Sequence, residues 1–84
     1  MLNIDYLKTI KSKGDFLEFL SLLRSDYLQN KDSWENNNLD DYLRAMGDWI
    51  ESMEHFYINT DQPVPTDIPW KVFADILIAS KMYE

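Results

Sequence analysis

Apolar residues recur every three or four positions through most of the chain. This spacing is typical of helices, because 3.6 residues per turn place such positions on one face. The strict apolar–polar alternation of a half-buried strand, bounded by turn residues, does not occur. The pattern predicts an all-α fold, a compact bundle of three long helices plus a short N-terminal helix, in one domain over residues 1–84.

Two helices are expected in the first third of the chain. A short one covers residues 3 to 10, with Asn3 as N-cap, and the first long one follows Ser12 and runs to about residue 30. The Ser12 hydroxyl and the Asp15 carboxylate suit the unpaired N–H groups at a helix N-terminus. The apolar stripe of this long helix comprises Phe16, Phe19, Leu20, Leu23 and Tyr27, widened by Leu17 and Leu28.

The second long helix is predicted from Leu39 to Tyr57, with Asn38 as its N-cap. Its apolar residues fall within an arc of roughly 160°, which we expect to face the core; they are Leu39, Tyr42, Leu43, Ala45, Met46, Trp49, Ile50, Met53, Phe56 and Tyr57. Gly47 lies on the opposite, polar side, where a glycine costs roughly 1 kcal/mol relative to alanine. This cost predicts that another group approaches the backbone closely at Gly47.

All three prolines fall between residues 63 and 69, which predicts an extended crossover before a third long helix from about Pro69 to Met82. This helix is apolar nearly all round, with Ala74, Ile78 and Met82 opposite its main apolar arc. Such a helix is either central in its own domain or presents a second face to another chain. We favour the second alternative, a homodimer or partner contact through Ile78 and Met82.

Charge and cysteine content narrow the class of partner. Eight Lys and Arg against fifteen Asp and Glu give a net charge of −7, which repels phosphate backbones and anionic lipid and suits a basic protein partner. We therefore expect no nucleic acid and no membrane. The absence of cysteine rules out disulfides and thiolate metal sites and suits a reducing, cytoplasmic location. The sequence contains neither a recognisable signal peptide nor about 18 consecutive apolar residues.

Candidate chemistry is sparse. His55 follows Glu51 by four residues, a metal-ligand spacing, but zinc sites need three or four ligands and this is the single histidine. The carboxylate pairs Asp40/Asp41 and Asp48/Glu51 lie on the polar arc, where nothing indicates a perturbed pKa. No phosphate-binding loop, nucleophile elbow or zinc-protease motif occurs. We expect no enzymatic activity, no cofactor and no metal.

The stretch "SWENNNLDDYL", residues 33 to 43, precedes the second long helix. Trp34 is expected to close one end of the core and to donate its indole N–H to a backbone carbonyl. For Glu35 and Asn36 two alternatives stay open. They brace the fold by pairing with loop backbone groups, or they bind a partner at the surface.

The last residues place the Glu84 side chain and a terminal carboxylate at a helix C-terminus, where the helix dipole disfavours negative charge. Two alternatives follow. Arg44 or Lys81 compensates the charge, or the tail is exposed and is recognised by a cationic partner.

Four segments carry a resemblance: "DFLEFLSLLRSDY", "SWENNNLDDYLRAMGDWIESM", "FYINTDQPVP" and "PWKVFADILIASKMYE". From about Ser12 onwards the chain resembles a family of small all-helical bacterial proteins of unknown function, which share a Trp-Glu-Asn signature and a C-terminal Tyr-Glu. The resemblance implies no activity. It implies a shared pattern that contains Trp34, Glu35, Asn36, Trp49, Asn59, Trp70, Tyr83 and Glu84.

These observations predict a small acidic protein-binding module. The specific hypothesis is an immunity-type or antitoxin-like inhibitor that covers a basic site on its partner with the polar arc of residues 40 to 55. The alternative is a homodimeric scaffold or regulatory subunit. The residues predicted to bind the partner are Glu35, Asn36, Asp41, Arg44, Asp48, Glu51, His55 and Glu84.

Overall fold

The computed structural model describes residues 2–83, and all regular structure in that range is helical. In chain order the helices are α1 (Ile4–Leu7), α2 (Lys13–Asn30), α3 (Leu39–Glu51), α4 (Met53–Asn59) and α5 (Trp70–Ser80), with a 3-10 helix at Lys31–Ser33 after α2. The prediction of an all-α fold is confirmed.

The predicted N-caps are confirmed by hydrogen bonds. The side-chain oxygen of Asn3 accepts from the backbone N–H of Tyr6 at 2.9 Å, and Asn38 does the same for Asp41 at 2.9 Å. Ser12 Oγ accepts from the N–H of Asp15 at 3.1 Å. Each cap satisfies an N–H group that lacks a partner within its helix.

The prediction of one continuous helix from Leu39 to Tyr57 was wrong, because Ser52 separates α3 from α4. Ser52 has φ −117° and ψ 16°, and its N–H bonds to the Trp49 carbonyl rather than continuing the α-helical pattern. The buried residues on either side, Ala45, Trp49, Met53 and Tyr57, are spaced by four. In an unbroken helix each step of four turns the side chain by roughly 40°, so the last residue would point away from the core. The break lets all four face inward.

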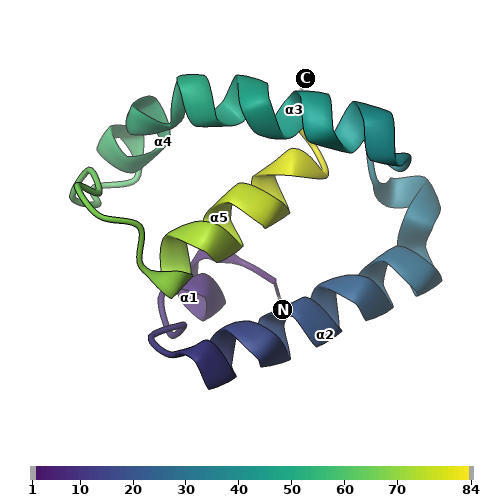
Figure 1. Cartoon of the computed structure of the whole chain (residues 1–84), viewed down its shortest axis with the longest axis horizontal. Coiled ribbons are helices and arrows are strands. Elements are labelled where there is room, and N and C mark those ends of the chain that lie inside the picture. Colours follow the sequence, from purple (N-terminus) through teal and green to yellow (C-terminus); the bar gives the residue numbers. More distant parts are fainter. Residues whose placement is uncertain (1, 84) are drawn as a thin grey trace.

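Helix α5 is the centre of the molecule (Figure 1). It contacts α1, α2 and α3, and its buried residues Val72, Ala74, Asp75 and Ser80 point in different directions around its axis. Its nearly continuous apolar character therefore reflects a central position, which was the less favoured of the two alternatives. Ile78, expected at a partner contact, packs against the core, whereas Met82 is exposed. The helix also begins at Trp70 rather than Pro69 and ends at Ser80, before Met82.

The core has two parts, one on each side of α5. One joins α1, α2 and the loop after it through Leu7, Ile10, Phe19, Leu23 and Trp34. The other joins α3 and α4 to α5 through Trp49, Met53, Tyr57 and Val72.

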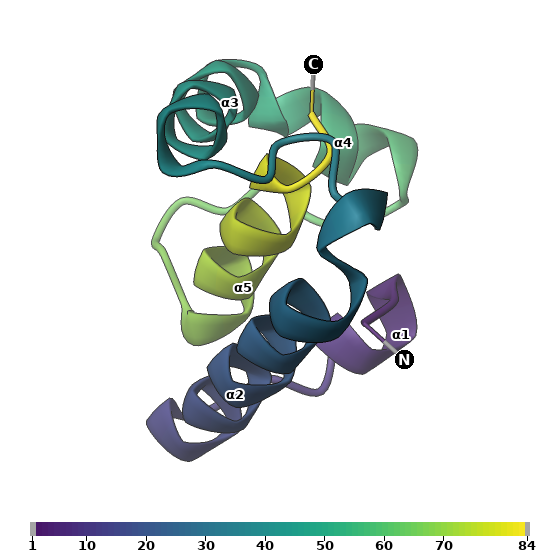
Figure 2. The same ribbon diagram turned by 90° about the vertical axis from the view of Figure 1, so that its right-hand side faces the viewer.

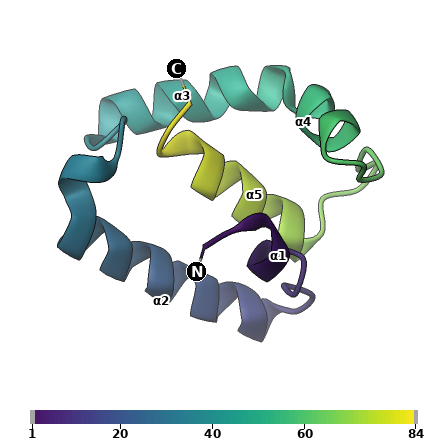
Figure 3. The ribbon, with the colours of Figure 1, turned by 180° about the vertical axis from the view of Figure 1, so that it is seen from behind.

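The molecule is thin, with extents of 32 × 27 × 17 Å. In Figures 2 and 3, α1 covers one side of α5, and among residues 2–83 no other helix covers the opposite side. Helices with a neighbour on one side bury a narrow stripe, so part of the predicted apolar arc stays exposed: Leu39, Leu43 and Ile50 on α3, and Leu17, Leu20 and Leu28 on α2. The prediction that Leu39, Leu43 and Ile50 face the core was wrong. In the same range no helix is both long enough and apolar enough to cross a membrane.

Candidate functional site

Asn36 ties the loop before α3 to the end of α5. Its backbone N–H donates to the Lys81 carbonyl at 2.8 Å, and its side-chain amide donates to the carbonyls of Ser80 (3.0 Å) and Tyr83 (2.8 Å). Carbonyls at a helix C-terminus lack partners within the helix, and Asn36 supplies them. With 5% of its surface exposed, Asn36 has the geometry of the bracing alternative and is not part of the exposed surface. Glu35, beside it, is exposed.

Trp34 closes the core, as predicted, with 7% of its surface exposed. The predicted backbone partner was wrong, because its indole Nε1 donates to Asp26 Oδ2 at 2.7 Å. Lys81 Nζ donates to the same oxygen at 2.8 Å and lies 5.3 Å from the centre of the Trp34 ring. The hydrogen bond from Lys81 is the main cause that lowers the pKa of Asp26. Lys81 therefore pairs with Asp26 on α2. Glu84, whose charge Arg44 or Lys81 compensates in one of the two alternatives, lies outside the described residues.

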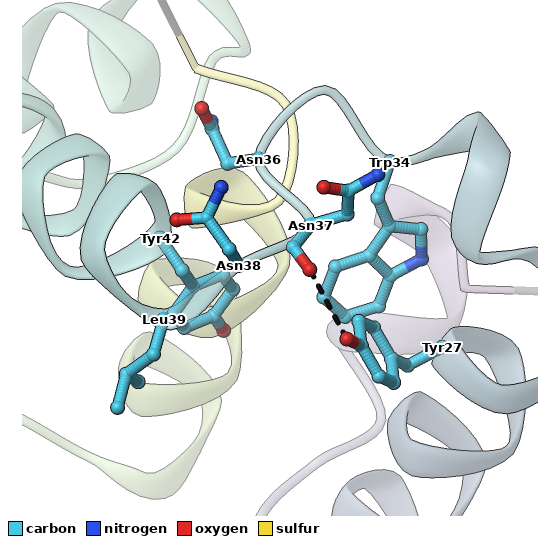
Figure 4. A pocket seen from close by; sticks show the side chains of 7 residues that line it. All are labelled: Tyr27, Trp34, Asn36, Asn37, Asn38, Leu39 and Tyr42. Carbon is cyan, nitrogen blue, oxygen red and sulfur yellow. Dashed lines mark hydrogen bonds between the residues drawn. The ribbon is translucent and has the colours of Figure 1, made fainter.

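A pocket of about 270 Å³ opens beside Trp34 (Figure 4). Tyr27 and Trp34 form one side, and Leu39 and Tyr42 form the other. Trp34 stacks on Tyr42 with ring centres 6.0 Å apart, and Tyr27 packs against Trp34 in a T-shaped arrangement with ring centres 5.2 Å apart. These contacts hold the aromatic walls in place.

Both tyrosine hydroxyls of this pocket are engaged in backbone hydrogen bonds. Tyr27 donates to the Asn37 carbonyl at 3.1 Å and Tyr42 donates to the Leu77 carbonyl at 2.7 Å. Burial raises the pKa of Tyr42 to about 12, so it stays neutral at physiological pH. The pocket thus offers rings rather than charges, which suits an apolar side chain.

The exposed face of α3 continues from this pocket, because Leu39 belongs to both. Leu39, Leu43 and Ile50 are 71%, 53% and 41% exposed and fall within about 40° around the helix axis. We call these three residues the α3 apolar strip. Three large aliphatic side chains in one line are a feature of docking surfaces more than of solvated helix faces.

Acidic side chains border the α3 apolar strip on the side away from the core. Asp40 and Glu51 are the acids nearest to the strip around the helix axis. Neither has an ion-pair partner within residues 2–83. Arg44 lies among them, 3.8 Å from Asp41 and 3.6 Å from Asp48. Those exposed, long ion pairs contribute little to stability. The face has a net negative charge, because Asp40, Asp41, Asp48 and Glu51 outnumber the single Arg44.

The remaining predicted site residues are placed as follows. Asp41, Arg44 and Asp48 do lie together on α3, with Glu51 one turn further along. His55 is exposed on α4, beyond the break at Ser52. Among the described residues no three His, Cys, Asp or Glu side chains gather as metal ligands would.

Gly47 lies between the α3 apolar strip and the acidic residues. A Cβ atom added there would meet nothing within 4 Å. The expected close approach to Gly47 is therefore not made by any part of the chain that the structure describes. The glycine is exposed on the α3 surface instead.

Asp75, which is 2% exposed on the central helix, was not among the site residues predicted from the sequence. Its Oδ2 accepts hydrogen bonds from Lys71 Nζ and Tyr57 Oη, both at 2.7 Å. Burial first, and then the bond to Asp75, raises the pKa of Tyr57 strongly. The sequence did contain a signal for this ion pair. Asp75 lies four residues after Lys71 in a mainly apolar helix, and that spacing places the two charges on one face.

Comparison with known proteins identifies a family. A family model described as "Family of unknown function (DUF7660)" matches residues 12–84. No curated protein and no solved structure matches the chain. The chain belongs to the DUF7660 family.

Proposed function

We propose that this member of the DUF7660 family is a non-enzymatic protein-binding module that docks a basic, amphipathic helix of a partner protein on α3. The observation that carries the proposal is the exposure of Leu39, Leu43 and Ile50 in one strip, beside acids that form no ion pair within residues 2–83. An amphipathic helix fits this arrangement, because its apolar face would cover the strip and its basic residues would face Asp40 and Glu51.

The pocket beside Trp34 supplies an anchor at one end of this surface. Its aromatic walls are fixed by ring contacts and by hydrogen bonds to backbone carbonyls. A large apolar side chain of the partner would enter it next to Leu39 without rearranging the walls. Preformed pockets of this kind favour affinity, because little conformational entropy is lost on binding.

The more specific form of the proposal is an inhibitor of the immunity or antitoxin kind. The net charge of −7 favours fast capture of a cationic protein through long-range attraction. The acids on α3 would then cover a basic functional site of that protein.

Site-specific photo-crosslinking in the native host tests the docking surface. A photoreactive residue in place of Leu43 should capture a basic partner, and one in place of Glu18, exposed on α2, should not. With that partner purified, Leu43→Asp should weaken binding about 10- to 100-fold, since it removes buried apolar area and buries a charge. Leu28→Asp is the matched control, because Leu28 is also exposed but lies on α2. Equal affinities of the two variants would refute the surface.

The charge component has its own test. Asp40→Lys combined with Glu51→Lys should slow association and reduce its dependence on salt, whereas Glu18→Lys should change the association rate much less. If association of the unmodified protein is insensitive to salt, the proposal of a basic partner is contradicted. Only the apolar contact with the α3 apolar strip would then remain of the proposed interface.

A second candidate function, a homodimeric scaffold, is supported by a different surface. Phe16, Trp70 and Phe73 form a cluster between α2 and α5 with ring centres 5.4 to 6.1 Å apart, and Trp70 and Phe73 are exposed. If two copies meet there, light scattering should show a dimer that Phe73→Asp converts to a monomer. A monomer at all accessible concentrations would eliminate this candidate.

A further inference from the structure

A second pocket, of about 520 Å³, is lined by residues of the N-terminal segment and of α3, α4 and α5. Figure 3 shows the side of the molecule that carries α1. The walls of the pocket are mainly apolar and include Ile4, Trp49, Phe56 and Ile78. The pocket is separate from the α3 apolar strip, since none of the strip residues lines it. A binding role here would be independent of the function proposed above.

Asp75, which is 2% exposed, is one of the residues that line this pocket. Lys71 and Tyr57 both donate to Oδ2, but Oδ1 is buried and accepts no hydrogen bond within residues 2–83. A buried acceptor without a donor is uncommon and costs free energy, because the same atom would be hydrated in the unfolded chain. Oδ1 therefore marks a place where a donor from outside the chain would be stabilised.

The charges around the pocket indicate which donor fits. Asp5 is a second acidic residue in the lining, and among residues 2–83 the lining contains no Lys, Arg or His. Lys71 already compensates Asp75 at Oδ2, so the local balance with Asp5 included is one negative charge. An anion would be repelled by this charge, and a neutral donor would gain no Coulomb attraction from it, whereas a cation would be attracted.

We propose that this pocket binds an apolar primary amine, with its hydrocarbon part against Trp49, Phe56 and Ile78 and its ammonium group donating to Asp75 Oδ1. The ammonium group supplies up to three donors and one positive charge, and the apolar walls exclude water from around it. Asp5, an exposed residue of the lining, adds electrostatic attraction. Oδ1 is buried, so binding includes a local rearrangement of the side chains that cover it.

Phenethylamine is a suitable probe, with phenethyl alcohol as the neutral analogue and hydrocinnamate as the anionic one. Each is titrated into the full-length, nitrogen-15-labelled chain at neutral pH. The amine should produce saturable NMR shifts at the Trp49 indole N–H and at the Asp75 and Ala79 amides, and leave the Trp34 indole unchanged. The alcohol should bind at least tenfold more weakly and the anion should not bind. Equal shifts from amine and alcohol, or no saturable shift from the amine, would overturn the proposal.

A pocket-filling variant provides the structural control. Ala79 is half-buried and lines the pocket, so Ala79→Met should occupy its space and weaken amine binding at least tenfold. Leu28→Met, on the exposed face of α2, should bind as the unmodified chain does. Asp75→Asn should weaken amine binding similarly, but it also disturbs the contacts with Lys71 and Tyr57. If the Asp75→Asn variant does not fold, the Ala79→Met variant decides whether the amine binds in this pocket. Undiminished binding by Ala79→Met would place the amine elsewhere and refute this site.

Discussion

Replacement of Asn36 by alanine tests the contact that closes the bundle. The substitution removes the side-chain amide that donates to the Ser80 and Tyr83 carbonyls at 3.0 and 2.8 Å, and it keeps the backbone N–H that donates to Lys81. The experiment therefore isolates the amide from the path of the loop. The contact joins residues 44 and 47 positions apart in the sequence.

The magnitude follows from the burial of each bond. The bond to Ser80 is buried, so its carbonyl stays unpaired after the substitution and costs about 1–2 kcal/mol. The bond to Tyr83 is partly buried, so water replaces the amide and the loss is about 1 kcal/mol. We expect the free energy of unfolding to fall by about 2–3 kcal/mol. For a domain of this size that corresponds to a decrease in melting temperature of about 10–20 °C.

Urea unfolding followed by circular dichroism measures the change, with Asn37→Ala as the matched control. Asn37 is an adjacent asparagine whose side chain makes no hydrogen bond within residues 2–83, and its carbonyl contact with Tyr27 survives the substitution. The control should lie within about 0.5 kcal/mol of the unmodified protein. Asn36→Asp should be at least as destabilising as the alanine variant, because its carboxylate would face carbonyl oxygens. Equal stabilities of the Asn36→Ala and Asn37→Ala variants would refute the bracing role.

Three further substitutions give distinct results. Gly47→Ala should raise the free energy of unfolding by about 0.5–1 kcal/mol in urea unfolding, since its Cβ would meet nothing within 4 Å and alanine favours the helix; a decrease would contradict the open surface there. Tyr57→Phe should lower it by about 1.5–3 kcal/mol, because a buried hydrogen bond to the Asp75 carboxylate is lost; an unchanged value would show that this bond contributes nothing. Asp26 has its pKa lowered below 3.8 in the folded state, first by the bond from Lys81, so its contribution is present above the unfolded value and is lost as pH falls through the folded one. Asp26→Asn should therefore destabilise the protein at pH 7 and flatten the acid limb of its stability curve, and parallel acid limbs for the two proteins would argue against the pair.

The acid titration has a matched control in Asp32→Asn. Asp32 is exposed on the 3-10 helix and takes part in no ion pair within the described residues. In the Asp32→Asn variant, the change in the free energy of unfolding between pH 7 and pH 3 should stay close to that of the unmodified protein. A change as large as that of Asp26→Asn would attribute the effect to net charge rather than to the contact with Lys81.

Local rules in the sequence determined the helices and most of their ends. Asn3, Ser12 and Asn38 cap helices because a short polar side chain followed by helix-forming residues satisfies N–H groups a few positions away. The same local information predicted the all-α class and the closing role of Trp34. It could not predict the break at Ser52, since the apolar period continues across that residue and only the position of α5 requires the chain to turn.

The surface that we propose for binding was predicted in part. The acids on α3 follow from helical period alone, whereas exposure of Leu39, Leu43 and Ile50 does not, because apolar residues in a stripe are ordinarily assigned to the core. How much of a stripe is covered depends on the number of neighbouring helices. The molecule measures 17 Å along its shortest axis, so each helix has few neighbouring helices.

Sequence by itself thus determined what each helix is made of, where most helices begin, and the acidic character of the whole, because these properties depend on neighbours within a few residues. Tertiary structure alone decided that α5 is central, that Asn36 is a brace rather than a surface residue, and that Asp75 is buried with one oxygen that accepts no hydrogen bond within residues 2–83. The physical reason is that burial and pairing are set by groups far apart in the chain, whose approach no local pattern records.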